Sequence, residues 1–203
     1  MGCGWTVPNT DFSRVTAIEV INGDSLDGPN SGMSLWQEQL NKGFRLTGIG
    51  GSDNHDADIP TDLRSAVGRP TTAVYSSMLS EHAILDSIRA GHVFIDVEGT
   101  KDRVVEFEAK TDMNTASMGD SIKAPPGQKV HFTVKMIALQ GAYPEIIQDG
   151  QSTKLIDKSA FNKPHETKGF DYVSDGKRHW FRVNVRSMNG SLLIVGNPIY
   201  LNF

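Results

Sequence analysis

The sequence predicts an α/β segment over about residues 1–100, followed by an all-β sandwich over about residues 101–203. Three observations support this fold class. Strand and helix patterns alternate along the first segment, as in α/β proteins. After Gly99, helical periodicity gives way to the two-residue alternation of strands. Turn-forming pairs typical of β-hairpins, Asp149-Gly150 and Asn189-Gly190, then separate the predicted strands.

The first segment is predicted to alternate strands with helices. The strands are short, rich in β-branched residues and bounded by glycine or polar loops, at residues 16–22, 46–49, 71–75 and 93–97. One helix is expected to begin at Ser34, where Gln37 completes a capping box, and to end at Gly43. Another is expected over residues 80–90, capped by its first residue, a serine, and stopped by Gly91. This order of elements favours parallel strands.

The second segment is predicted to be built from strands. They are expected at residues 104–110, 130–137, 146–147, 153–156, 181–185 and 192–195. Val130 and Phe132 alternate with His131 and other polar residues, which is the period of a strand. His131 and His179 are expected at outward or strand-start positions, and His165 in a polar loop.

Composition excludes several classes of function. The 203 residues include 20 Lys and Arg against 24 Asp and Glu, a formal net charge of −4, so the chain lacks the positive stripe that nucleic-acid binding needs. The single cysteine, Cys3, excludes an intrachain disulfide framework and a CxxC metal or redox site. No apolar run approaches the ~20 residues that span a bilayer, and no signal peptide is recognised. We therefore expect no membrane partner and a cytoplasmic location.

The most informative segment runs from Gly50 to His55, directly after a predicted strand. Ligands of α/β proteins bind where loops leave the carboxyl ends of strands. Asp53 and His55 are two residues apart, so in an extended segment both side chains can reach one metal ion. A carboxylate with an imidazole suits zinc, manganese or iron better than calcium. The competing interpretation is a polar loop with an Asx-turn at Asp53.

Glu19 is a second candidate, because it lies in a predicted strand whose neighbours are apolar. A carboxylate there is either paired or faces a site, since unpaired burial is costly. Two other histidines have simpler interpretations: His82 is expected on the polar side of a helix, and His92 at a turn or strand edge. Cys3 has no neighbouring His or Lys that would favour its thiolate, so nucleophilic catalysis has little support.

Several segments together resemble the PHP (polymerase and histidinol phosphatase) superfamily, in the branch that includes carbaryl-type carbamate hydrolases. The resembling segments follow the family's order along nearly the whole chain, at residues 17–23, 35–43, 47–55, 67–72, 83–93, 179–183 and 197–200. One of them, residues 47–55, reads TGIGGSDNH and contains both candidate ligands.

The resemblance implies the second half of a distorted seven-stranded α/β barrel, with a metal cluster at the carboxyl ends of its strands. Members hydrolyse phosphoesters, or in this branch carbamates and related esters, with a metal-bound hydroxide as nucleophile. Asp53 and His55 match the family's last metal-binding motif, which implies a divalent metal (zinc, manganese or iron) and a small-molecule ester or phosphoester substrate. Glu19 matches a family position. Arg69 is expected near the barrel mouth against an anionic substrate, although a surface arginine is the simpler interpretation.

The chain also departs from the family. The family's H-x-H pair, early carboxylate and intermediate histidines should precede Asp53, yet no histidine precedes His55. The residues near Trp5 resemble the family segment that follows a His-Pro pair, so a cloned fragment, a misassigned start and a natural half-protein all fit. Two protein ligands hold a catalytic metal weakly, since catalytic zinc usually has three. An incomplete barrel exposes strand edges, so a homo-oligomer or a missing amino-terminal half is the expected partner.

The alternative function is a non-catalytic β-sandwich that binds a partner, with a vestigial α/β half. Trp180, Tyr200 and Tyr172 are the candidates for a sugar- or partner-binding face. Aromatic residues at strand spacing more often belong to a core, which is the competing interpretation of all three.

Overall fold

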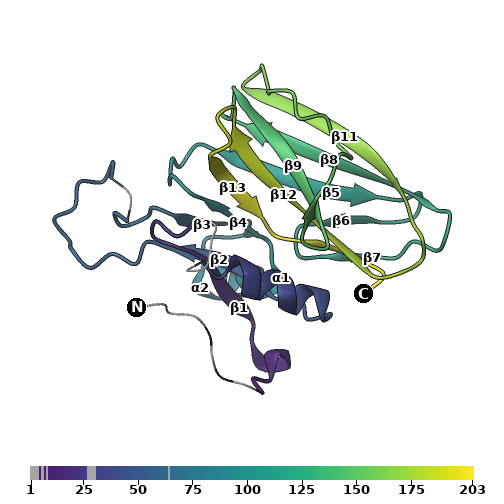
Figure 1. Cartoon of the computed structure of the whole chain (residues 1–203), viewed down its shortest axis with the longest axis horizontal. Coiled ribbons are helices and arrows are strands. Elements are labelled where there is room, and N and C mark those ends of the chain that lie inside the picture. Colours follow the sequence, from purple (N-terminus) through teal and green to yellow (C-terminus); the bar gives the residue numbers. More distant parts are fainter. Residues whose placement is uncertain (1–4, 6, 8, 27–30, 64) are drawn as a thin grey trace.

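The computed structural model describes residues 5, 7, 9–26, 31–63 and 65–203, and Cys3 lies outside these ranges. The protein is rich in β-structure and is built in three layers (Figure 1). A four-stranded sheet forms the first layer and an eight-stranded sheet the second. Helix α1 (Met33–Asn41) and the strands β1 (Ala17–Asn22) and β2 (Thr47–Gly51) cover the far side of the second sheet.

The elements of the first segment lie close to their predicted positions. A short 3-10 turn precedes them, and β3, α2 and β4 complete them, at Phe12–Arg14, Thr71–Val74, Glu81–Ala90 and Val93–Asp96. Helix α2 has the predicted ends: the Ser80 hydroxyl accepts from the backbone of Ala83, and Gly91 adopts a φ of 79°. The expected start of α1 at Ser34 is wrong, because the helix begins at Met33. Its N-cap residue is Gly32, which has no side chain to cap the helix, so Ser34 does not cap it as predicted.

The prediction of parallel strands holds for β1 and β2 but not for the rest of this segment. These two strands are parallel, with Asn22 opposite Gly51. β3 and β4 are antiparallel, which corrects the expectation. Helix α2 leaves and returns at the same end of β3, where the backbone of Tyr75 donates to the carbonyl of His92 at 2.9 Å, so it makes no crossover.

The second segment supplies most of both large sheets. The four-stranded sheet has the order β11-β8-β5-β6, with bounds His165–Val173, Lys129–Ile137, Val104–Lys110 and Thr115–Ser117. The eight-stranded sheet contains β10-β9-β12-β13-β4-β3, where the new strands are β10 (Gln151–Ser152), β9 (Ala142–Gln148), β12 (His179–Ser187) and β13 (Leu192–Gly196). β14 (Ile199–Leu201) pairs with β12, and β7 (Ser121–Ile122) pairs with β14.

Both predicted hairpins form, at Asp149-Gly150 between β9 and β10 and at Asn189-Gly190 between β12 and β13. Two other expectations are wrong. Residues 153–156 are not a strand, and His165 begins β11 instead of lying in a loop.

Two hydrophobic cores lie on opposite faces of the eight-stranded sheet. Phe181 and Val183 of β12 join the core between the two sheets, whereas Trp180 joins the core beneath α1. Trp180 and Tyr200 are therefore both buried, which rules them out as an exposed sugar-binding face and confirms their interpretation as core residues. Tyr172 is half-buried and packs against Phe181.

The chain before and after residue 100 shares one sheet, because β4 pairs with both β3 and β13. Side chains extend this connection to β2. The Asn197 amide bonds both the N–H and the carbonyl of Gly48, and the Thr72 hydroxyl does the same with Gly50. β2 is thus held between β1 and the large sheet. No helix within the described ranges is long and apolar enough to cross a membrane.

Candidate functional site

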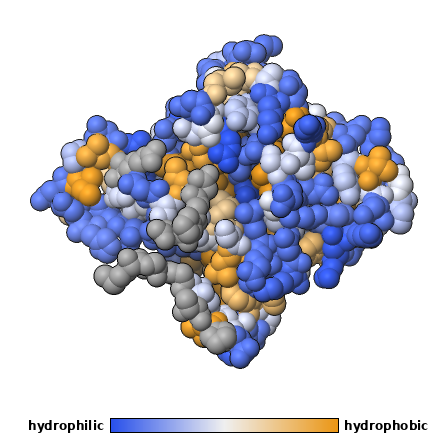
Figure 2. Space-filling view, in the orientation of Figure 1, coloured by the Kyte–Doolittle hydropathy of each residue, from blue (hydrophilic) through white to orange (hydrophobic). Residues whose placement is uncertain are grey.

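Asp53 and His55 lie in the loop that leaves the carboxyl end of β2. This loop, which leads to β3, projects from the body of the protein (Figure 1). Figure 2 shows hydrophobic groups among hydrophilic ones on the projection, where Leu63 and Val67 are exposed. The His55 Nε2 lies 3.1 Å from the Asp53 Oδ1, and the two side chains are 85% and 50% exposed. The two side chains are therefore in contact and open to solvent. The expected extended segment is wrong, because Asp53 has a φ of 49°.

Glu19 lies at the same end of the β1–β2 pair. It is exposed, because β1 presents Val20 and Ile21 to the core instead. The carboxylate accepts from the Asn22 amide at 3.1 Å. A side chain at Gly51 would place its Cβ only 2.4 Å from the Glu19 Oε1, so the carboxylate lies across the backbone of Gly51. It thus lies over the backbone that leads directly into Asp53.

A glycine brings the two strand ends together. Gly23 follows β1 with a φ of 50°, and a Cβ there would lie 3.0 Å from the carbonyl of Ser52 and 3.7 Å from the Asp53 Cβ. The N–H of Gly23 donates to the carbonyl of Gly51 at 2.8 Å. The Asn54 amide donates to the carbonyl of Ser65 at 2.8 Å, which fixes the loop on its other side. Local packing thus holds Asp53 beside the end of β1.

The donor set fits two ligands of one divalent ion. Two ligand atoms at 2.0–2.1 Å from a tetrahedral zinc are about 3.3 Å apart, close to the separation of the Asp53 oxygen and the His55 nitrogen. Across the described ranges, no group of three or more His, Cys, Asp or Glu side chains gathers as a metal site. The structure therefore shows a pair with carboxylate and imidazole donors, with the Glu19 carboxylate at the same end of the two strands.

Arg69 lies in a different hollow. Its Nη1 donates to the carbonyl of Thr61 at 3.3 Å. The hollow, of about 270 Å³, is also lined by the carboxylates of Asp62 and Glu98. These negative charges offset the guanidinium, and no contact joins Arg69 to the Asp53–His55 pair among the described residues. The structure does not bring the fourth candidate residue together with the other three.

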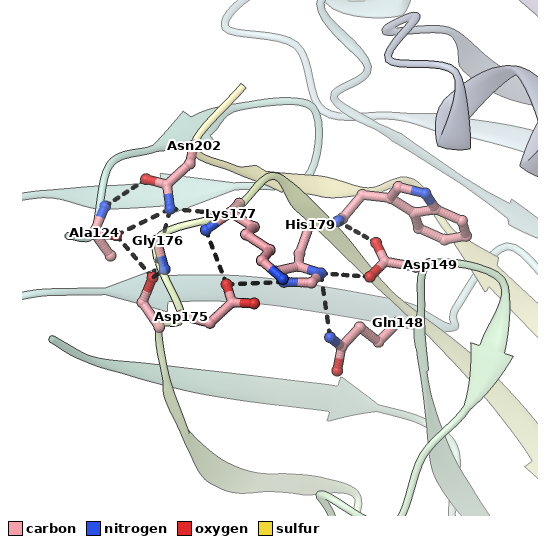
Figure 3. Close-up of polar contacts among 10 residues, drawn as sticks. Ala124, Gln148, Asp149, Asp175, Gly176, Lys177, His179 and Asn202 are labelled. Atoms are coloured by element: carbon pink, nitrogen blue, oxygen red, sulfur yellow. Dashed lines mark hydrogen bonds and ion pairs between the residues drawn. The ribbon is translucent and has the colours of Figure 1, made fainter. Parts of the chain in front are cut away.

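The sequence reasoning missed a histidine cluster at the end of the eight-stranded sheet (Figure 3). The ring of His179 lies between two carboxylates: Nδ1 is 2.5 Å from Asp149, and Nε2 is 3.1 Å from Asp175. Carboxylate oxygens only accept hydrogen bonds, so both contacts are hydrogen bonds when both ring nitrogens carry protons. The backbone N–H of Lys177 and the His179 ring lower the pKa of Asp175.

This cluster joins separate parts of the chain. Asp149 also accepts from the backbone of Trp180 at 2.9 Å, and its carbonyl accepts from the Asn41 amide of α1 at 3.3 Å. Asn41 in turn accepts from the indole N–H of Trp180 at 2.8 Å. The cluster therefore ties α1 to the turn between β9 and β10 and to the start of β12. The position of His179 at a strand start was predicted. Asp175 lies only four residues before it, but Asp149 is thirty residues away and comes from another strand end.

A second missed cluster carries buried charge. Arg182 is buried beneath α1, where its guanidinium lies 5.3 Å from the Trp36 ring and donates to Met33 and Asn184. Burial lowers the pKa of Arg182 to about 9. Burial raises the pKa of the neighbouring Glu145, but hydrogen bonds from Arg186 and Ser152 outweigh it and lower that pKa to about 2. Both groups are charged at neutral pH, and they balance one another inside the fold.

No protein-family model matches the chain, and no curated protein matches it either.

Proposed function

We propose that the chain is part of a metal-dependent hydrolase of the PHP type, which acts on a small phosphoester or on a carbamate or related ester. The observation that supports this proposal is the meeting of Asp53 and His55 at the carboxyl end of the parallel β1–β2 pair, beside Glu19. Ligands of parallel α/β structures bind at such strand ends. The alternative is a non-catalytic binding protein with a vestigial α/β half.

In this proposal the carboxylate of Asp53 and the imidazole of His55 hold zinc, manganese or iron. The bound ion supplies Lewis acidity and makes water a better nucleophile at neutral pH. In this proposal Glu19 orients a substrate or accepts a proton. Among the described residues its Oε2 accepts a hydrogen bond only from the Asn22 amide, so the carboxylate can accept further hydrogen bonds. In this proposal Arg69 would contact an anionic part of the substrate, although Asp62 and Glu98 line the same hollow and oppose an anion there.

Further ligands have to come from elsewhere, because two protein ligands hold a catalytic metal weakly. We propose a second copy of the chain or a segment that completes the barrel. The pairing of β1 supports this idea. Among the described residues it pairs with β2 along one edge, and no strand pairs with its other edge. An unpaired edge of this kind favours pairing with another strand.

The experiment is a comparison of two His–Asp pairs with the same exposure. His82 and Asp86 on α2 lie 3.0 Å apart and are 88% and 51% exposed, almost the same as His55 and Asp53. Zinc and manganese content and hydrolysis of phosphoester, carboxyl-ester and carbamate substrates are measured for the wild type, Asp53→Ala, His55→Ala and the control His82→Ala.

The proposal predicts that both substitutions at the β2 loop remove metal and any hydrolysis, whereas His82→Ala keeps both. Equal metal content in all variants would contradict it. A wild type without metal or hydrolysis, alone or at concentrations that drive association, would favour the non-catalytic binding protein.

A further inference from the structure

A hollow at the amino end of β2 has two arginines and no carboxylate in its lining. Its volume is about 280 Å³, and Arg45, Arg89, Gly91, Gly119 and Tyr200 are among its lining residues. It is distinct from the site proposed above, because Thr47 at the start of β2 lines it while Asp53 and His55 follow the strand's other end. In a chain with a net charge of −4, such a local excess of positive charge calls for an explanation.

Arg45 is held in place without an acidic partner. Its Nη2 donates to the carbonyl of Gly119 at 2.6 Å, and its guanidinium lies 4.9 Å from the ring centroid of the buried Tyr200. A guanidinium has five N–H donors, so most remain available after this one bond. No carboxylate lies within ion-pair distance of Arg45 in the part of the chain that the structure describes. Because the Tyr200 ring and the Gly119 carbonyl hold the Arg45 guanidinium in one orientation, it is preorganised to donate two parallel hydrogen bonds to the oxygens of one ligand.

Two glycines, Gly91 and Gly119, form part of the wall of this hollow. A Cβ at Gly91 would lie 2.9 Å from the Cα of Gly119, and one at Gly119 would lie 2.0 Å from the carbonyl oxygen of Ala90. Both glycines also have positive φ, at 79° and 91°. The close contact of the two chain segments therefore requires glycine at both positions of this wall.

The charges nearest the hollow do not cancel the arginines. Helix α2 ends here, and carbonyls at a helix C-terminus repel anions, but those of Ile88 and Ser87 already accept from Gly91, His92 and Thr47. The Asp120 carboxylate next to Gly119 is engaged elsewhere, by His92 at 3.0 Å and by the backbone of Ser117 at 2.9 Å. Arg89 shares its charge with Asp86 at 2.8 Å, so Arg45 is the principal cation.

We propose that this hollow binds the phosphate group of a small molecule, with the Arg45 guanidinium as the bidentate donor and Arg89 as a second cation. Bidentate arginine–phosphate pairs are short, charge-assisted and geometrically specific. The Arg45 guanidinium, with the partly neutralised Arg89 beside it, attracts a doubly charged phosphate more strongly than a singly charged carboxylate. The proposal is independent of hydrolysis at the β2 loop, because none of the lining residues named here belongs to that site.

The test is a titration of the full chain with inorganic phosphate and, separately, with acetate, followed by amide NMR in the presence of a metal chelator. The variants are Arg45→Gln, Arg45→Lys, Arg89→Gln and the control Arg178→Gln. Arg178 is a matched control because it also lies against an aromatic ring, that of Phe203 at 5.6 Å, in another hollow. Thermal unfolding without phosphate establishes that each variant is folded.

We expect phosphate to shift the amides of Gly91 and Gly119, and acetate to bind more weakly. Arg45→Gln should weaken phosphate binding by about tenfold or more, the loss expected for a charge-assisted hydrogen bond. Arg45→Lys should weaken it too, because an ammonium cannot replace the fork. Arg89→Gln should have a smaller effect, which still reports on the site if Arg45→Gln fails to fold. Arg178→Gln should leave binding unchanged.

Three results would overturn the proposal. The first is a wild type that does not bind phosphate in the millimolar range. The second is a set of shifts centred on the β2 loop, which would assign the phosphate to the hydrolase site instead. The third is equal loss of binding in Arg45→Gln and Arg178→Gln, which would indicate attraction by overall charge.

Discussion

His179 and His55 both contact carboxylates, but their surroundings differ. His179 is 16% exposed, and its ring lies between Asp149 and Asp175. His55 is 85% exposed and contacts Asp53 through one nitrogen. The first histidine has both nitrogens engaged by groups that also hold backbone and α1, whereas the second leaves the rest of its ring and of its carboxylate partner facing solvent.

This difference separates a structural cluster from a candidate ligand pair. A metal ion at His179 would have to displace the contacts of its ring with Asp149 and Asp175, and Asp149 also accepts from the backbone of Trp180. At His55 it would displace a single solvent-exposed contact, which contributes little to stability. Metal binding is therefore expected to cost more stability at His179 than at His55, although both sites contain a histidine and aspartates. The following substitutions test this difference.

The largest effect is expected at Glu145, which balances the buried Arg182. Glu145→Ala should lower the free energy of unfolding by about 3–5 kcal/mol, because it removes the carboxylate that pairs with Arg186 at 2.7 Å and offsets the charge of the buried Arg182. Urea unfolding measures this loss. Glu106→Ala is the matched control, since Glu106 pairs with Lys135 at 3.0 Å on the exposed side of a strand. We expect that control to lose less than about 1 kcal/mol, and equal losses would contradict the assignment.

The loss of stability at low pH should report on Glu145 as well. The pKa of Glu145 is about 2 in the folded protein, against an ordinary value of 4.5. A carboxyl group with a lowered folded pKa stabilises the fold fully above its unfolded pKa, so this contribution should fall as the pH drops from 4.5 towards 2. The expected total is about 3 kcal/mol. The measurement is the pH dependence of urea unfolding for the wild type and Glu145→Gln, and parallel curves would contradict the prediction.

A smaller loss is expected at the His179 cluster. Asp149→Asn keeps a residue that tolerates the φ of 50° there but removes the charge that faces His179. Thermal or urea unfolding should show a loss of about 1–3 kcal/mol, the cost of weakening hydrogen bonds to charged groups. A loss below that of an exposed substitution would mean that the contact between Asp149 and His179 does not stabilise the fold.

The smallest effect is expected at the β2 loop without metal. Asp53→Asn and His55→Gln should each change stability by less than about 0.5 kcal/mol, as is usual for exposed positions. Asparagine also tolerates the φ of 49° at position 53. Unfolding is measured with a chelator present. A loss as large as that of Asp149→Asn would show that the pair is part of the fold's support and not a free pair of donors.

The comparison also explains what the sequence could predict. Elements with local signals were found: Ser80 and Gly91 bound α2, and Asp149-Gly150 forms a hairpin turn. β11 was missed because only Phe170 of its nine residues is buried, so it lacks the apolar alternation that identifies a strand. The β3–β4 pairing was missed because the length of a helix does not say whether it crosses over a sheet.

The candidate pair was predictable for a similar reason, since Asp53 and His55 are neighbours in sequence. His179 and Asp149 are thirty residues apart and meet only because β9 and β12 pair, with Phe181 opposite Gln148. Likewise, Trp180 alternates with core residues as an outward position would, yet it is buried because α1 covers that face. Local chemistry predicts a site within a loop, whereas the partners supplied by distant strands depend on topology.

The most direct test of the central claim is cobalt(II) binding, because the visible spectrum of this ion reports its coordination by nitrogen and oxygen donors. The account predicts that the wild type and His82→Ala give the same spectrum and that His55→Ala and Asp53→Ala lose it. A spectrum that survives both substitutions in the β2 loop, or that disappears with His82→Ala, would contradict the assignment of Asp53 and His55 as metal ligands.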